Sequence, residues 1–222
     1  MCFSAVASFA AAGVTGAIGI VTLTRVSRLR ELPLAATPLF FAIQQSIEGL
    51  LWLQLPLAPD GSASSALTLL YLLFADVFWP VYAPLAVLLV EPGAGRRRLM
   101  LLWLGVGAVV AAYLLWWILS RPHGALILEG HIVYPTDSGH PIIVALGYLA
   151  ATGFPLMLSS QRSVVALGAI ILVGSVIAYT FYWEAFVSVW CFFAAAASAV
   201  ILFHFEKARR HRLHAAGRTA DA

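Results

Sequence analysis

Two acidic residues lie inside long apolar stretches of this chain, and they are the first candidates for chemistry. Glu48 and Asp76 each stand among about 20 mostly apolar residues. A charged side chain inside a bilayer is costly, so such a residue suggests a functional site. Both acids could instead be protonated and satisfied by a neighbouring group. Four further residues are expected to line a ligand site with these acids: Gln44, Tyr179, Tyr182 and Glu184.

Imidazole, carboxylate and thiolate groups are suitable ligands for zinc or another transition-metal ion. The candidates for such a site are Cys2, His131 and His140. No two histidines are spaced i, i+4 on an expected helix, so the spacing does not define a metal site. A bound transition-metal ion is therefore a hypothesis, and surface histidines with an inert cysteine are the alternative.

The composition determines the elements that must position these residues. The chain is 62% hydrophobic and 10% charged, and its mean hydropathy is +0.92. Soluble domains carry about 25% charged residues, so lipid must cover this surface, and lipid admits only helices or closed barrels. The apolar runs have the length of a membrane-crossing helix. We therefore predict an all-α fold, an integral membrane bundle of seven transmembrane helices in one domain, 1–207. The predicted spans are 3–24, 34–56, 66–90, 99–120, 141–160, 164–183 and 185–205, followed by a basic tail, 208–222, expected to fray after one or two turns.

Basic residues alternate from loop to loop. They occur at 25–30, at 96–98, at 162 and in the tail, whereas the other loops hold only Arg121. The positive-inside rule places the N-terminus outside and the C-terminus in the cytoplasm, in the plasma or inner membrane. Because no basic face exists beyond these loops and the tail, we expect no nucleic-acid partner. Stretches of small residues favour close helix packing first and a homo-oligomer face second.

The segment 121–140 is expected to contain a short β-hairpin. Two β-prone runs, 125–128 and 131–134, flank Glu129-Gly130, and a two-residue connection ending in glycine favours a hairpin. We expect this hairpin to cover the outer face as a lid. Most acids and imidazoles at or above membrane depth fall toward that face, which predicts a polar cavity opening outward.

Prolines follow Asp76 at positions that disturb a helix. Pro80 removes the N–H that would bond the carbonyl of Asp76, and Pro84 does the same for Pro80. Irregular helix at membrane depth is tolerated where it lines a cavity or is buried in protein.

Several short motifs together resemble an uncharacterised prokaryotic family of small polytopic membrane proteins. They are Met1-Cys2-Phe3-Ser4-Ala5, Gln44-Gln45 with Glu48-Gly49, Trp79-Pro80 with Pro84, His131-Ile132 with Tyr134, Ser159-Ser160, and the run from Ser188 to Ala194. The resemblance covers nearly the whole chain. The family has no assigned activity, so the resemblance implies no reaction or cofactor.

Three functions remain open from the sequence. The first is a binding or sensing membrane protein whose outward cavity takes a small cation, a metal or an amphiphile. The second is a metal-dependent membrane hydrolase or redox enzyme. The third is a structural partner of another membrane complex, in which the polar residues make contacts between helices.

Overall fold

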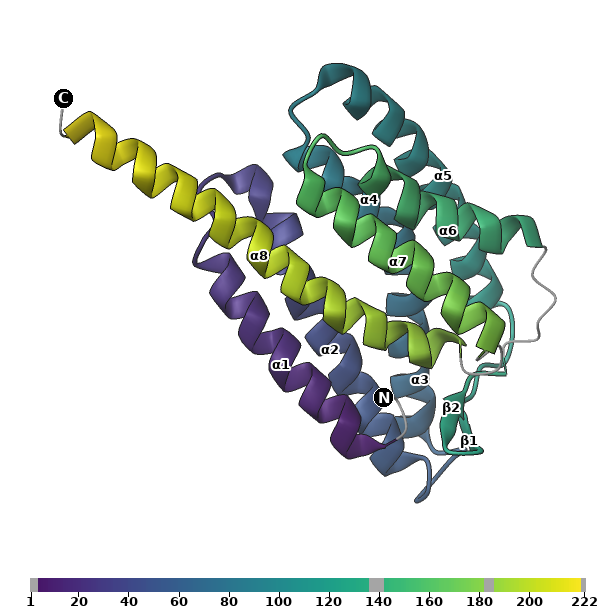
Figure 1. Ribbon diagram of the computed structural model, residues 1–222. Helices are drawn as coiled ribbons and strands as arrows, with labels where there is room; N and C mark the ends of the chain where they lie inside the picture. The colour runs from purple at the N-terminus through teal and green to yellow at the C-terminus, as the bar shows by residue number, and fades with distance from the viewer. Residues whose placement is uncertain (1–3, 136–141, 182–185, 221–222) are drawn as a thin grey trace.

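The computed structural model describes residues 4–135, 142–181 and 186–220, which fold mostly into helices packed side by side (Figure 1). The helices are α1 (Ala5–Leu23), α2 (Leu32–Gln54), α3 (Ser62–Leu72), α4 (Trp79–Val90), α5 (Ala94–Leu119), α6 (Ile142–Met157), α7 (Arg162–Phe181) and α8 (Phe186–Ala220). A short 3-10 turn, η1 (Leu29–Glu31), precedes α2. A π-helical segment, η2 (Leu73–Phe78), joins α3 to α4 in one continuous rod.

The predicted helical class is confirmed for the described residues, with a small sheet beside the helices. Three helical segments are long and apolar enough to cross a membrane: Ala5–Leu23, Ser62–Val90 and Ala94–Leu119. Two shorter apolar helices cover Ile142–Met157 and Arg162–Ile177. Large apolar side chains on these helices face outward, for example Val109 at 71% exposure and Ile143 at 72%.

Some helix ends differ from the predicted bounds. Helix α5 begins at Ala94, before the predicted bound at residue 99. The arginines in its first turns are good helix formers, so they extend the helix toward the N-terminus. Helix α8 continues to Ala220, so the expectation of an early frayed tail was wrong. Its extension is supported by Glu206, whose carboxylate pairs with Arg209 and Arg210 one turn further along the helix.

Glycines allow close contacts between neighbouring helices. A side chain at Gly19 would collide with Leu39 of α2, and one at Gly49 would collide with the Phe9 ring of α1. These positions explain why α1 and α2 lie close together along their length (Figure 1). Helices α7 and α8 also lie side by side, and Gly174 meets Phe193 between them. Helices α7 and α8 are therefore two separate helices packed against each other.

The predicted hairpin is confirmed. Strands β1 (Leu126–Leu128) and β2 (His131–Val133) pair antiparallel, with Leu126 opposite Val133. The turn residues Glu129 and Gly130 have φ values of 48° and 79°, the left-handed geometry of a tight hairpin connection.

The hairpin packs on the bundle at the end where α2 finishes and α3 begins. Ile132 is 1% exposed and belongs to one cluster with Leu51, Leu55 and Tyr71. The ring of Tyr134 stacks on Tyr71 with centroids 4.6 Å apart. The hairpin thus packs against this end of the bundle, and its place as a lid on the outer face stays a prediction.

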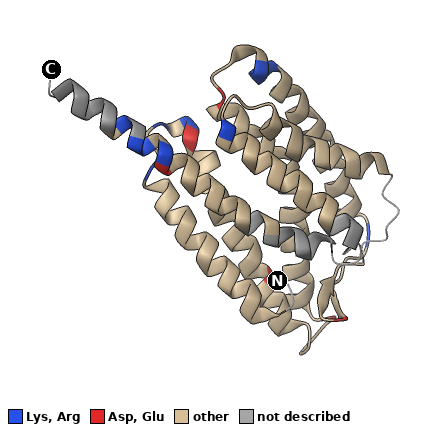
Figure 2. Cartoon of the chain, viewed as in Figure 1, with Lys and Arg blue, Asp and Glu red and all other residues tan. Residues whose placement is uncertain are grey.

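Most basic residues lie at one end of the bundle. Figure 2 shows the arginines and lysine gathered at the α1–α2 and α4–α5 connections, the start of α7 and the second half of α8. At the opposite end, Arg121 lies over the Trp117 ring, 3.2 Å from its centroid. The basic clusters that are separated in sequence therefore share one end in space, which we call the arginine end.

Candidate functional site

Asp76 is the central residue of the 29-residue apolar helical rod Ser62–Val90. It lies in the π-helical segment η2, four residues before Pro80. Pro80 cannot donate to the carbonyls behind it, so the helix must find other partners there. The Tyr148 hydroxyl of α6 donates to the carbonyl oxygen of Ala75, at 2.5 Å. The irregular helix expected around Asp76 is therefore present, and π-helical turns are frequent at functional sites.

The carboxylate of Asp76 has no hydrogen-bond or ion-pair partner among the residues that the structure describes. Its side chain is half-buried between the bundle and the outside. Carboxylate and carbonyl oxygens are hard ligands that suit protons and small cations better than soft metals. The local chemistry is therefore that of a single carboxyl group on a π-helical segment.

Glu48 is fully buried and bonded within its own helix. Its carboxylate accepts a hydrogen bond from the Gln45 amide at 3.2 Å. Gln44, one turn before, accepts from the indole N–H of Trp79 at 2.7 Å and so ties α2 to α4. The Trp79 ring also packs on Phe41, with centroids 4.4 Å apart. Gln44 and Glu48 thus form a polar layer of α2 that Gln44 ties to α4, and among the described residues Asp76 shares no hydrogen bond with them.

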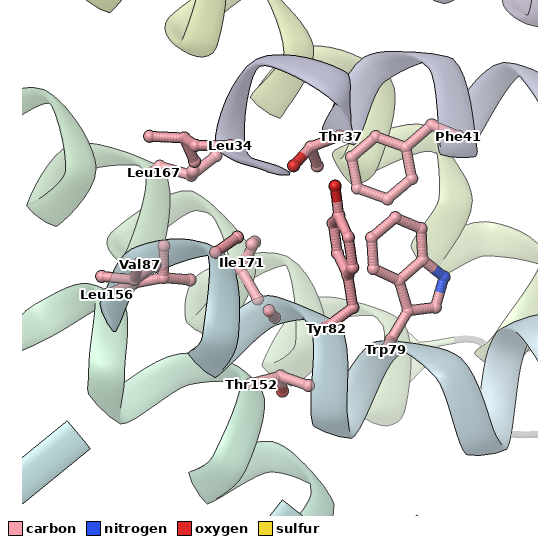
Figure 3. Close-up of a pocket in the computed structure, with 12 residues that line it drawn as sticks. Leu34, Thr37, Phe41, Trp79, Tyr82, Val87, Thr152, Leu156, Leu167 and Ile171 are labelled. Carbon is pink, nitrogen blue, oxygen red and sulfur yellow. The ribbon is translucent and has the colours of Figure 1, made fainter. Parts of the chain in front are cut away.

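An apolar cavity of about 30 Å³ adjoins this layer on the side of the arginine end (Figure 3). Tyr82 stands at its centre, and its hydroxyl donates to the carbonyl of Pro33. Figure 3 shows that hydroxyl directed toward Thr37. The cavity is lined by Leu34, Thr37, Phe41, Trp79, Tyr82, Ala83, Ala86, Val87, Thr152, Leu156, Leu167 and Ile171. It differs from the polar, outward-opening cavity that the sequence predicted, which remains a prediction.

Several predicted site residues fall outside the described part of the chain. Tyr179 lies in α7, but its side chain is not described. Cys2, His140, Tyr182 and Glu184 lie outside the described residues. His131 begins β2 in the hairpin at one end of the bundle. Among the described residues no three of His, Cys, Asp and Glu are grouped as metal ligands, and a transition-metal site therefore stays a prediction.

Glu91 is a buried acid that the sequence reasoning did not select. It ends α4 and is 0% exposed. One carboxylate oxygen accepts from the Ser159 hydroxyl and from both the N–H and hydroxyl of Ser160, and the other accepts from the N–H of Gly93. Burial opposes ionisation, but these hydrogen bonds outweigh it and hold the pKa of Glu91 below its ordinary value. Glu91 therefore fastens the α6–α7 connection to the arginine end of α4.

The sequence reasoning also missed a contact between Ser163 and His204, because the two residues are far apart in sequence. The Ser163 hydroxyl of α7 lies 2.5 Å from Nδ1 of His204 in α8. The pair borders a smaller apolar cavity of about 10 Å³. No spacing rule could have linked two helices whose contact depends on the bundle arrangement.

Compared with known protein families, residues 1–218 match one family along nearly the whole chain. The chain belongs to the family of unknown function DUF6629. The resemblance to an uncharacterised family is thereby confirmed, and DUF6629 supplies no reaction or ligand. No curated protein and no solved structure matches the chain.

Proposed function

We propose that this chain is an integral membrane protein that binds a small monovalent cation, either a proton or an alkali ion, at Asp76. In this proposal the chain crosses the plasma or inner membrane seven times, with its N-terminus outside and its C-terminus in the cytoplasm. The observation that carries the proposal is the single carboxylate of Asp76 at the centre of the longest apolar rod.

Membrane insertion is supported by the outer surface of the bundle. Three helical segments have the length and apolarity to cross, and their large outward side chains would meet water unfavourably in a soluble protein. The gathering of basic residues at the arginine end supports the orientation (Figure 2), because basic loops stay in the cytoplasm.

The position of Asp76 supports the binding of a cation. An ionised carboxylate at the membrane centre is costly, and binding one positive charge removes that cost. A single carboxylate offers one negative charge, which a monovalent ion neutralises. Carbonyls of interrupted helices supply oxygen ligands to such ions in membrane transporters, and Pro80 leaves the carbonyl of Asp76 without its usual donor.

The test is the dependence of stability on cations, measured by thermal unfolding of the purified protein in detergent. Titrations use sodium chloride, potassium chloride and, as an ionic-strength control, choline chloride, each between pH 5 and 8. A bound ion at one hundred times its dissociation constant stabilises the folded state by about 2.7 kcal/mol. We expect Asp76→Asn to abolish the cation response and to remove the part of the pH response that Asp76 contributes, because the amide carries no charge. Asp60→Asn, which changes an exposed acid between α2 and α3, is the matched control and should respond as the wild type does.

A wild-type protein whose stability ignores sodium, potassium and pH alike would refute the proposal. Stoichiometric zinc, iron or copper that is lost in His131→Ala would instead favour the metal-dependent enzyme. An Asp76→Asn variant with wild-type stability and response would favour the purely structural role.

A further inference from the structure

We infer that the arginine end binds the headgroup of an anionic phospholipid at a basic corner formed by the α1–α2 connection and α8. The basic corner comprises residues 25–31 of the connection, which includes η1, and residues 206–212 of α8. The inference depends on the membrane insertion proposed above, but it is independent of a cation at Asp76.

Contacts between side chains and backbone hold the two segments of the basic corner together. Nε of Arg25 lies 3.3 Å from a carboxylate oxygen of Glu206. The guanidinium of Arg212 donates to the carbonyl oxygen of Arg25 at 3.0 Å. Arg212 also exerts its charge on the Glu31 carboxylate. Basic residues from the two segments therefore form one surface, which Figure 2 shows beside α1.

Positive charge exceeds negative charge in the basic corner. The two segments hold seven arginine and lysine residues but only two acids. One acid, Glu206, shares its carboxylate among three arginines, Arg25, Arg209 and Arg210, at 3.3, 3.8 and 3.5 Å. A single carboxylate cannot neutralise three guanidinium groups, so the surface keeps a positive excess that suits an anionic ligand.

The arginines on either side of Leu29 are available to such a ligand. The side chains of Arg28 and Arg30 are exposed, and among the described residues neither has an ion-pair partner. The neighbouring acid, Glu31, already accepts from the N–H and the hydroxyl of Ser27. A guanidinium group binds phosphate through two parallel hydrogen bonds, so a phosphate group matches these two arginines.

Apolar side chains adjoin these charges, and they favour a lipid over a soluble polyanion. Leu29 stands between Arg28 and Arg30 and is 83% exposed. Ile20 of α1 and Phe203 of α8, about one turn before the basic segments, are also exposed. A phospholipid satisfies both kinds of group, because its phosphate meets the arginines while its acyl chains meet the apolar side chains.

The test is native mass spectrometry of the detergent-purified protein, titrated with phosphatidylglycerol or with phosphatidylcholine of the same acyl chains. We expect one molecule of phosphatidylglycerol to bind, about tenfold or more tightly than the neutral lipid. Arg28→Gln with Arg30→Gln should weaken that binding roughly thirtyfold. The matched control is Arg97→Gln with Arg98→Gln, which removes the same charge from the exposed start of α5 at the same end. It should change binding less than about threefold.

A second pair of variants tests the apolar part of the contact. Leu29→Ser should weaken phosphatidylglycerol binding about tenfold, because the leucine leaves water when the lipid binds. Leu57→Ser is the control, since Leu57 is 79% exposed in the connection between α2 and α3 at the opposite end. Glycerol phosphate, which carries the phosphate without acyl chains, should not displace the lipid at equal concentration.

Several outcomes would overturn the inference. Equal binding of the two lipids would do so, and so would equal losses in the two arginine pairs. Displacement of the lipid by glycerol phosphate or by a single-stranded oligonucleotide would assign the basic corner to a soluble polyanion instead. Unfolding curves show whether each variant keeps its fold.

Membrane insertion is measured separately, by washing liposomes that contain the protein with alkaline carbonate. Release of the protein would refute both the insertion and the lipid site. A protein that stays in the liposomes but shows no preference for phosphatidylglycerol would refute the lipid site alone.

Discussion

The contact between α4 and α5 gives the sharpest test of the packing, through Gly107→Ala. A methyl group at Gly107 would lie 1.8 Å from the carbonyl oxygen of Pro80 and 2.8 Å from its carbonyl carbon. Pro84, four residues further on, has no N–H to bond the carbonyl of Pro80. This carbonyl lies against α5, where the absence of a side chain at Gly107 leaves it room.

The magnitude follows from two opposing effects. Alanine in place of glycine inside a helix is favourable by about 0.5–1 kcal/mol. Overpacking against a backbone atom, which cannot move aside as a flexible side chain could, costs typically 1–3 kcal/mol and occasionally more. At 1.8 Å the two helices must separate, so we expect the upper part of that range and a net loss of about 2 kcal/mol.

The control lies half a turn away. No atom approaches within 4 Å of a methyl group built at Gly105, so Gly105→Ala should be neutral or stabilising by about 0.5–1 kcal/mol. Thermal unfolding of both variants in the same detergent measures the difference. A loss of 2 kcal/mol lowers the midpoint by about 4–8 °C in a chain of this size. If Gly107→Ala unfolds at the temperature of Gly105→Ala, the proposed contact with Pro80 does not exist.

The remaining predictions concern the two ends of the bundle. Glu91→Gln should destabilise the fold by about 1.5–3 kcal/mol despite its similar shape, because each carboxylate oxygen accepts from a backbone N–H and an amide nitrogen in either place would meet a donor. Folding lowers the pKa of Glu91, so its contribution to stability is fully present above the ordinary pKa of about 4.5 and is lost as the pH falls through the lower pKa of the folded state. The unfolding curves of the wild type and Glu91→Gln should therefore converge at low pH. Curves that stay parallel would contradict this expectation. Both turn residues have positive φ, so Glu129→Asn should stabilise the hairpin and Gly130→Ala should weaken it by about 1 kcal/mol. Hydrogen exchange of the β2 amides measures the difference. Equal protection in both variants would count against the turn geometry.

The helices, the hairpin and the irregular segment were predictable because each depends on local sequence. The apolar runs have the length of helices, Glu129-Gly130 lies between two β-prone runs, and Pro80 follows Asp76 by four residues. The helical class and these elements therefore agree with the structure, whereas the seven membrane crossings stay a prediction. The bounds of α5 and α8 were less predictable, because arginine-rich segments carry no apolar periodicity and can continue a helix into water.

The contacts of the site were not predictable to the same degree. The sequence selected Gln44 and Glu48 as site residues, but it did not show that Gln45 donates to Glu48 or that Gln44 accepts from Trp79 on another helix. Which face of α2 meets α4 depends on the crossing of the two helices. That crossing is decided by side chains on both, so one helix considered alone cannot reveal it.

What the sequence determined by itself was the helical class of the chain and the location of one acid within a long apolar segment. Composition and the spacing of apolar runs act residue by residue, and so they specify helices, a lipid-compatible surface and an acid at the centre of Ser62–Val90. Only the tertiary structure decided that Glu91 fastens Ser160, that Ser163 meets His204, and that two apolar cavities share Leu34 and Leu167. These features join residues from different helices, and such contacts exist only after close packing has selected one arrangement of the helices.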